Sequence, residues 1–236
     1  MMRLQKYLAL SGVASRRNAE KMIIEGRVSV NHMPVTAMGL QVDETSDLVE
    51  VDGNPVSIQE EKHYIAYNKP LGEVTTVSDP EGRATVMDKF RDYPVRLYPV
   101  GRLDYDSEGL LLLTNDGDMM NHVLHPSHEV SKVYLVKASN RVTEDEISQL
   151  RRGVLIEGKM TSPASVRLIR HETFDTVMLI TIHEGRNRQV RKMVQAVGHQ
   201  VVSLKRVGFG PVLLGDLPSG KWRRLTEKEI EKLRSI

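Results

Sequence analysis

The feature that most constrains this chain is residues 101–117, which read GRLDYDSEGLLLLTNDG. The run at 110–113 is apolar, short and uninterrupted, which predicts a strand buried on both faces. The turn before it, residues 101–109, carries Asp104, Asp106 and Glu108 between two glycines that let the backbone reverse. Carboxylates beside a buried strand are costly unless they are paired or take part in chemistry. Spacing alone favours a solvated acidic hairpin, so a function for this acidic turn depends on motifs elsewhere in the chain.

The composition leaves room for one large domain, or for a small domain and a larger one. The chain has 236 residues, 40% of them hydrophobic, and a net charge of only +2, so nucleic-acid binding must be judged from clusters of charge. Cysteine is absent, which excludes disulfides, thiol nucleophiles and Cys-ligated zinc. The N-terminus lacks a signal-peptide core, and no run reaches the roughly 18 apolar residues of a membrane helix. We therefore expect a cytoplasmic protein with no membrane association.

The first part of the chain alternates short helical and strand patterns. Ser15 is a typical N-cap residue, followed by apolar residues at helical spacing. We expect helices at 2–10 and 16–25, strands at 26–31 and 49–53, and a polar linker at 54–61. Residues 1–60 would then form one small domain with its linker, and residues 61–236 a second, larger domain.

The second part begins with a strand at 63–70 and continues through a segment at 73–95 that we expect to be irregular and surface-exposed, apart from a helical turn at 85–90. From residue 131 onward the order strand, helix, strand, strand, helix, strand is typical of a ferredoxin-like unit. The expected strands are 133–138, 166–169, 176–183 and 201–207, and the expected helices are 117–124, 144–152, 187–197 and 226–234. These elements predict an α+β fold with one large mixed, mostly antiparallel sheet.

Four further motifs accompany the acidic turn in the same order along the chain. They read NKPLG at 68–72, KVY at 132–134, GRNRQVRK at 185–192 and LKR at 204–206. Together with residues 101–117 they resemble the motifs of the RNA pseudouridine synthases, in the RsuA/RluB-like branch that modifies ribosomal RNA. A joint match of this length is far more specific than any one of the motifs.

The resemblance implies a role for four side chains. Asp104 would be the catalytic carboxylate, and Tyr134 would stack on the target base. Arg191 would form an ion pair with Asp104, and Leu204 would form the apolar floor of the pocket. Asp104 could attack the anomeric carbon as a nucleophile or remove a proton from the neighbouring C2′, and the sequence does not choose between these roles.

Residues 1–48 carry a second resemblance. The segments LQKYL, GVASRR, EKMI and GRVSVN are similar to the S4 (α-L) RNA-binding domain. The resemblance implies an RNA-binding face made of Arg3, Lys6, Arg16, Arg17, Lys21 and Arg27. In the second domain, we expect further contacts to RNA from Lys69, Arg102, Arg186, Arg188, Lys192, Lys205 and Arg206, with Arg102 filling the stack that the target base leaves.

The reaction implied by the family oxidises nothing and transfers no phosphate, so we expect no cofactor. His122, His125 and His128 lack a carboxylate or cysteine at a matching spacing, and we expect no metal. The expected partner is ribosomal RNA, most of all 23S RNA or a pre-ribosomal particle, and the expected state is a monomer. Small-subunit 16S RNA, a non-catalytic S4-type ribosome-associated protein, and a retaining glycosidase-like hydrolase using Asp106 or Glu108 remain as alternatives.

Overall fold

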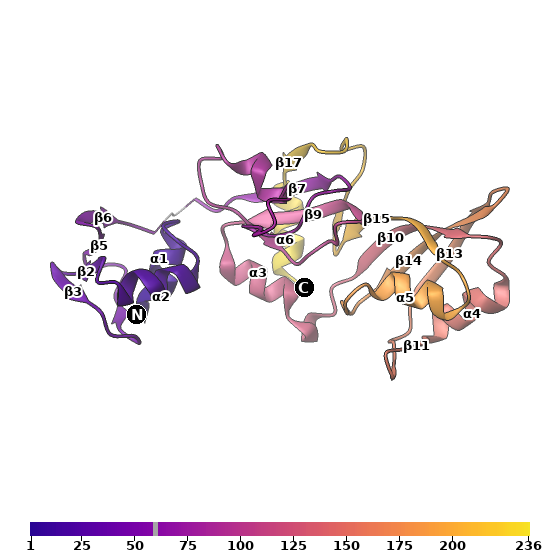
Figure 1. Ribbon diagram of the computed structural model, residues 1–236, viewed down its shortest axis with the longest axis horizontal. Coiled ribbons are helices and arrows are strands. Elements are labelled where there is room, and N and C mark those ends of the chain that lie inside the picture. The colour runs from indigo at the N-terminus through magenta and orange to yellow at the C-terminus, as the bar shows by residue number, and fades with distance from the viewer. Residues whose placement is uncertain (59–60) are drawn as a thin grey trace. The chain divides into compact units, whose positions relative to one another are not determined.

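The computed structural model describes residues 1–58 and 61–236, which divide into two compact units (Figure 1). The first unit contains residues 1–63 together with the short segments 93–96 and 115–117. The second contains 64–92, 97–114 and 118–236. Residues 59–60, the end of the linker predicted at 54–61, lie outside the described residues.

The first unit packs two helices against short strands, as predicted for residues 1–53. Ser15 caps the second helix, because its Oγ accepts a hydrogen bond from the Asn18 N–H at 3.2 Å. Leu8 and Ile23 are almost fully buried in the shared core. The elements are β1 (Met2–Arg3), α1 (Leu4–Leu10), α2 (Arg16–Ile24), β2 (Val28–Val30), β3 (Met33–Val35), β4 (Gln41–Val42), β5 (Val49–Val51) and β6 (Asn54–Val56). The main sheet runs in the order β3-β2-β5-β6.

The linker prediction for 54–61 is wrong at its start. Residues Asn54–Val56 form β6, which pairs antiparallel with β5 and is the edge strand of the sheet. Proline is tolerated on an edge strand because its missing N–H does not interrupt a ladder. Pro55, which favours a loop when the sequence is considered alone, is therefore compatible with the strand. Val56 is further fixed by the Tyr7 hydroxyl, which donates to its carbonyl at 3.1 Å.

The second unit is built on a nine-stranded sheet whose main path is β13-β14-β10-β15-β9-β7-β17. Among the described strands of this sheet only β9 and β15 pair in parallel, so the sheet is mixed and mostly antiparallel, as predicted. The ferredoxin-like order is confirmed by the run β13-β14-β10-β15. The strands are β7 (Tyr64–Lys69), β8 (Tyr98–Val100), β9 (Glu108–Thr114), β10 (Lys132–Ser139), β13 (Ser165–His171), β14 (Asp175–Ile182), β15 (Val201–Phe209), β16 (Val212–Leu213) and β17 (Trp222–Arg224).

Helices accompany both halves of this sheet (Figure 1). They are α3 (Gly117–Leu124), α4 (Glu144–Arg152), α5 (Gln189–Ala196) and α6 (Glu227–Arg234). The sequence did not predict the small hairpin of β11 (Leu155–Ile156) and β12 (Lys159–Met160). No helix in the described part of the chain combines the length and the apolar composition needed to cross a bilayer.

The segment at 73–95 is irregular, with a 3₁₀ helix at Val86–Phe90, but it is not all on the surface. Thr75, Thr85 and Val86 are buried, which corrects the expectation of general exposure. The Thr75 hydroxyl donates to the Leu103 carbonyl at 2.7 Å and accepts from the Leu103 N–H at 3.2 Å. Thr75 is buried in this segment and supports the backbone of the acidic turn.

Gly109 lies where two strands of the sheet approach each other closely. It opposes Arg206 where β9 and β15 pair, and its φ of 107° lies in the region that favours glycine. A Cβ placed there would lie 2.3 Å from the Arg206 carbonyl oxygen, which belongs to the backbone and cannot swing away. The acidic turn therefore requires glycine at its last position for two reasons: the backbone has a positive φ, and there is no space for a Cβ.

We predict that Gly109→Ala destabilises the protein more than Gly198→Ala does. Gly198 has a similar φ of 90° but nothing within 4 Å of an added Cβ, so its replacement isolates the conformational cost. The overlap at Gly109 should add about 1–3 kcal/mol to that cost. Urea denaturation of both variants measures the difference, and equal losses would show that β15 moves aside without penalty.

Candidate active site

A cavity of about 820 Å³ lies in the second unit. The acidic turn, β10, β15 and the loop before α5 all contribute to its wall. Asp104, Tyr134 and Leu204, three of the four residues predicted to be catalytic, line it together. Residues 30 to 100 positions apart in sequence therefore meet at one concave site, which is the usual form of a small-molecule or nucleotide pocket.

The sheet register explains how the cavity floor forms. Tyr134 on β10 pairs with Arg206 on β15, and Val136 pairs with Leu204. Cross-strand partners project from the same face of a sheet, so Tyr134, Leu204 and Arg206 share the face on which the cavity lies. Tyr134 is 9% exposed and Leu204 is 6% exposed. The floor is thus an aromatic and an apolar side chain held by a regular ladder.

Asp104 reaches the cavity from the acidic turn. Its carbonyl accepts from the Ser107 N–H at 3.1 Å, which closes the turn, and its side chain is 31% exposed. Arg188 Nη1 lies 3.8 Å from Asp104 Oδ2. The carboxylate is therefore within reach of solvent and next to a guanidinium, an arrangement that keeps it available to a ligand in the cavity.

Arg191 does not pair with Asp104 as predicted. Among the described residues, its ion pair is with the Asp106 carboxylate at 3.5 Å, and its Nη2 also donates to the Asp106 carbonyl at 2.5 Å. Asp106 also accepts two hydrogen bonds from Arg188, at 2.9 and 2.7 Å, so its carboxylate lies next to both guanidinium groups. Burial lowers the pKa of Arg191, and the Arg188 hydrogen bonds hold the pKa of Asp106 below its ordinary value.

Asp106 is thus a structural partner of Arg188 and Arg191, whereas the sequence alone suggested it only as a carboxylate of a glycosidase-like hydrolase. Arg188 adopts a left-handed conformation with φ of 52°, which a non-glycine residue rarely takes without compensation. Its bidentate ion pair with Asp106 supplies a compensating interaction. The sequence does indicate this possibility, because Asp104 and Asp106 are alternate residues of a tight turn and such residues can bind different partners.

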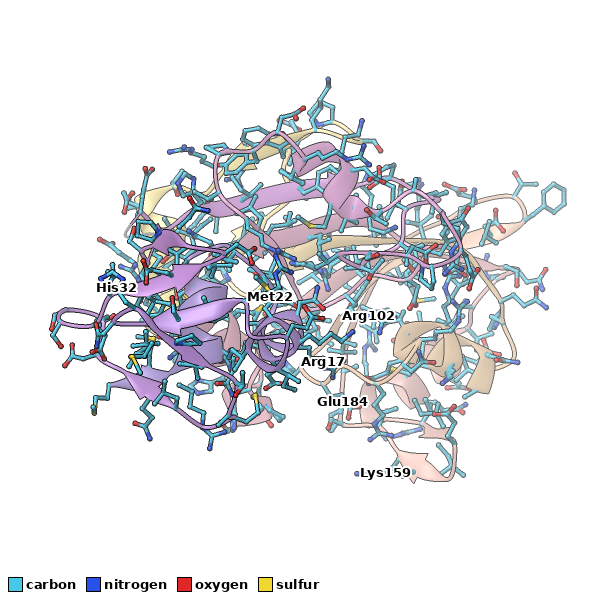
Figure 2. All side chains as sticks on the ribbon, turned by 60° about the vertical axis from the view of Figure 1, so that its left-hand side comes forward. Arg17, Met22, His32, Arg102, Lys159 and Glu184 are labelled. Atoms are coloured by element: carbon cyan, nitrogen blue, oxygen red, sulfur yellow. The ribbon has the colours of Figure 1, made fainter. Side chains whose placement is uncertain are left out.

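The cations predicted to bind RNA in the second unit fall into four groups, the last of which is buried. Arg102 is exposed and makes no hydrogen bond or ion pair within the described chain; Figure 2 labels it. Arg186 is held by Glu184 and by the carbonyls of Lys159 and Met160, so it fixes the β11–β12 hairpin. The partly exposed ion pairs are Arg188 with Asp106, Lys192 with Glu157 and Lys205 with Glu108.

Two of the predicted RNA contacts are buried, which corrects their assignment. Lys69 has no exposed surface, and its Nζ donates to the carbonyls of Pro70 at 2.9 Å and Ser107 at 2.7 Å. It therefore anchors the acidic turn instead of reaching a phosphate. Arg206 is 2% exposed and lies in the cavity floor. Both motifs mix buried residues with more exposed ones, such as Asn68 with Leu71 and Leu204 with Lys205, so sequence position alone did not reveal which cation is buried.

The first unit has a basic surface of its own. Arg3, Arg16, Arg17 and Lys21 are exposed, and no acidic side chain pairs with them in the described part of the chain (Figure 2 labels Arg17). Arg27 differs, because Asp52 accepts two hydrogen bonds from its guanidinium, at 3.0 and 2.6 Å. Lys6 is half-buried on α1.

We predict a pH-dependent stability difference between the wild type and Lys69→Met. Burial lowers the pKa of Lys69 to about 8, from an ordinary value of 10.5. Between these values the unfolded chain holds a proton that the folded chain has released, so wild-type stability rises with pH relative to the variant. The rise should approach about 1.4 kcal/mol per pH unit. Urea titrations from pH 7 to 10 test it, with exposed Lys89→Met as the control; a constant difference would contradict the shift.

Comparison with known proteins agrees with the motifs in both units. Residues 63–196 match the family model described as RNA pseudouridylate synthase, and residues 2–49 match the S4 domain. The chain is 44% identical to an uncharacterized RNA pseudouridine synthase of Aquifex aeolicus, over 98% of this chain and 93% of that protein. It is 43% identical to ribosomal large subunit pseudouridine synthase B of Bacillus subtilis, over 100% of this chain and 97% of that protein.

A solved structure agrees as well. The crystal structure of a pseudouridylate synthase superposes with a TM-score of 0.72 at 34% identity, covering 99% of this chain and 100% of the other. The identity and coverage exceed what a shared fold alone would produce, and the acidic turn, the Tyr134 strand and the basic loop before α5 all fall within the matched region. The protein therefore belongs to the RNA pseudouridine synthase family and carries an S4 domain ahead of its synthase domain.

Proposed function

We propose that this enzyme converts a uridine of ribosomal large-subunit RNA, the 23S RNA, to pseudouridine, with Asp104 as the carboxylate that acts on the ribose. The observation that carries the proposal is the convergence of Asp104, Tyr134 and Leu204 on one cavity. A flat aromatic side chain and an apolar floor suit a pyrimidine base. An accessible carboxylate above them suits a step at the sugar.

The reaction is an isomerisation that exchanges one glycosidic bond for another. The bond from uracil N1 to C1′ breaks, the base turns, and C5 bonds to C1′. Asp104 serves either as the nucleophile at C1′ or as the base that removes the C2′ proton. Arg188 places its positive charge 3.8 Å from this carboxylate. The ring of Tyr134 stacks on the detached base while the base turns.

A target uridine within structured RNA must leave its stack before it can enter the cavity, at a cost of a few kcal/mol. Arg102 is suited to fill the vacated position, because its guanidinium is planar and free within the described chain. We propose residues 1–60 as the domain that supplies affinity, through Arg3, Arg16, Arg17 and Lys21, and 61–236 as the domain that performs the chemistry. Contacts to phosphates place a protein on RNA without reading its sequence.

The proposal that large-subunit RNA is the substrate rests on the names of similar proteins. The Bacillus subtilis protein named a large-subunit synthase aligns over nearly its whole length, and a Vibrio cholerae protein with the same name is 40% identical. We propose that the enzyme works as a monomer, in the cytoplasm where ribosomal RNA is assembled. Small-subunit RNA is the second candidate substrate. Pseudouridine mapping of both RNAs from cells that lack the gene, with and without a restored copy, decides between them.

We predict that Asp104→Asn abolishes pseudouridine formation but leaves the fold and RNA affinity largely intact. The substitution removes the charge and the nucleophile with almost no change in volume. The rate should fall below detection, because no other carboxylate occupies that position in the cavity wall. Single-turnover assays of the purified variant measure this, with Asp216→Asn, outside the cavity, as the matched control. Turnover of Asp104→Asn above background would refute the assignment.

We predict that replacing Arg16 and Arg17 with Ala weakens RNA binding without slowing the bound enzyme. Each lost phosphate contact releases about one fewer counterion, so the slope of log affinity against log salt should fall by about 2. Binding at several salt concentrations, alongside rates at saturating RNA, measures both effects, with exposed Arg152→Ala as the control. Unchanged affinity with a collapsed rate at saturation would refute the division of labour between the domains.

A further inference from the structure

Besides the exposed Arg102, two cations at the cavity have no acidic partner within the described residues. Lys132 lies two positions before Tyr134 on β10, and its Nζ donates to the carbonyls of Val130 at 2.8 Å and His183 at 3.1 Å. Arg206 is 2% exposed, and its Nε donates to the Leu110 carbonyl at 2.7 Å. Carbonyl oxygens satisfy hydrogen bonds but do not neutralise charge, so both groups remain net positive.

The guanidinium of Arg206 also keeps an unused donor. Its Nη2 is buried and has no hydrogen-bond partner in the part of the chain described here. Unpaired buried donors are rare in folded proteins, and a charged one is more costly than a neutral one. Burial lowers the pKa of Lys132, and the neighbouring charge of Arg206 lowers it further. The fold therefore maintains a positive region that nothing in the described chain offsets.

The acidic side chains on the cavity wall do not supply the missing charge. Asp104 faces Arg188, and Glu184 is engaged by Arg186 and Gln189. Glu129, the remaining acid on the wall, is exposed and forms no ion pair with either cation. A partner for Lys132 and Arg206 must therefore arrive with the substrate.

A β-bulge brings the two cations together. The register of β10 against β15 shifts between Val133 and Tyr134, which leaves Val207 as the extra residue on β15. Both cations then face the same ring: Lys132 Nζ lies 5.9 Å, and the Arg206 guanidinium carbon 5.4 Å, from the centroid of Phe209. The electron-rich ring face offsets part of their repulsion. Bulges beside active sites commonly redirect side chains in this way.

The reaction creates an anion at this place. When the bond from N1 to C1′ breaks, its electron pair leaves with uracil, whose negative charge spreads over N1, O2 and O4. The same anion forms whether Asp104 bonds to C1′ or takes the C2′ proton. Reattachment then uses the electrons of the C5–C6 double bond. C5 loses its proton, N1 gains one, and the Asp104 carboxylate is regenerated, so the isomerisation balances without another reactant.

We infer that Lys132 and Arg206 stabilise the detached uracil anion while it turns above Tyr134. Lys132 contacts the anion through its remaining N–H, and Arg206 acts from within the floor as a positioning residue that adds positive potential. The register supports this placement, because Arg206 is the cross-strand partner of Tyr134, whose ring carries the base. This inference rests on the proposed function and adds the group that receives the charge leaving the ribose.

The test compares Lys132→Met with Lys132→Arg, which keeps the charge. The probes are transcripts of large-subunit ribosomal RNA made with uridine or with 5-fluorouridine, whose base bears negative charge more easily. Because C5 of 5-fluorouracil has no proton to lose, the rate compared on the two RNAs is that of breaking the N1–C1′ bond in a single turnover. We expect Lys132→Met to react at least about tenfold more slowly at saturating uridine RNA, as for the loss of one anion-stabilising donor. The deficit should shrink on 5-fluorouridine RNA, RNA affinity should be unchanged, and Lys132→Arg should recover part of the rate.

Each other outcome overturns a specific claim. A weaker affinity with an unchanged rate at saturation would mean that Lys132 binds a phosphate, and an equal deficit on both RNAs would mean a structural role. Either result refutes the uracil-anion site. Arg206→Met is tested in the same way if its melting temperature shows that it folds, and Lys132→Met decides the question if it does not. A wild type that forms no pseudouridine in this RNA refutes the proposed function itself.

Discussion

The parallel pairing of β9 with β15 is the contact on which the rest of the second unit depends. It joins the ferredoxin-like strands to the strands that carry the acidic turn, through only two residue pairs, Glu108 with Lys205 and Gly109 with Arg206. Because β9 begins where the acidic turn ends, this pairing sets Asp104 above the strand that holds Leu204. A bulkier residue at 109 would separate the two halves of the active site.

Anchors on the other side of the turn complete its support. Lys69 holds the Ser107 carbonyl from within the core, and Thr75 holds both backbone groups of Leu103. These bonds flank Asp104 in sequence, so the carboxylate sits on a backbone fixed at both ends while its side chain stays partly exposed. A catalytic group needs this combination, because pre-organisation lowers the cost of reaching the reactive geometry.

Charge is distributed unevenly over the molecule, although the chain is nearly neutral. Many cations around the cavity are matched by carboxylates, such as Arg188 with Asp106 and Lys192 with Glu157. In the described chain, cations without an acidic partner include Arg16, Arg17 and Lys21 on α2 in the first unit, and Arg102, Lys132 and Arg206 at the cavity in the second unit. Surface cations without partners suit phosphates, whereas desolvated ones suit a charge that develops during the reaction. The net charge of the chain therefore indicates little about nucleic-acid binding, whereas the positions of the individual charges indicate more.

The sequence by itself predicted most of the helices and the longer strands, the ferredoxin-like unit and the family. Alternation and helical spacing are local properties, and the motifs around Asp104, Tyr134 and Leu204 lie in chain segments whose conformation is mostly local too. Only the tertiary structure decided that Lys69 and Arg206 are buried, that Asp106 holds Arg191, and that residues 54–56 form an edge strand. Burial and ion-pair partners depend on segments that are far apart in the chain. Which of two neighbouring carboxylates pairs with a guanidinium depends on small differences in distance in the folded protein, and a residue pattern does not encode those distances.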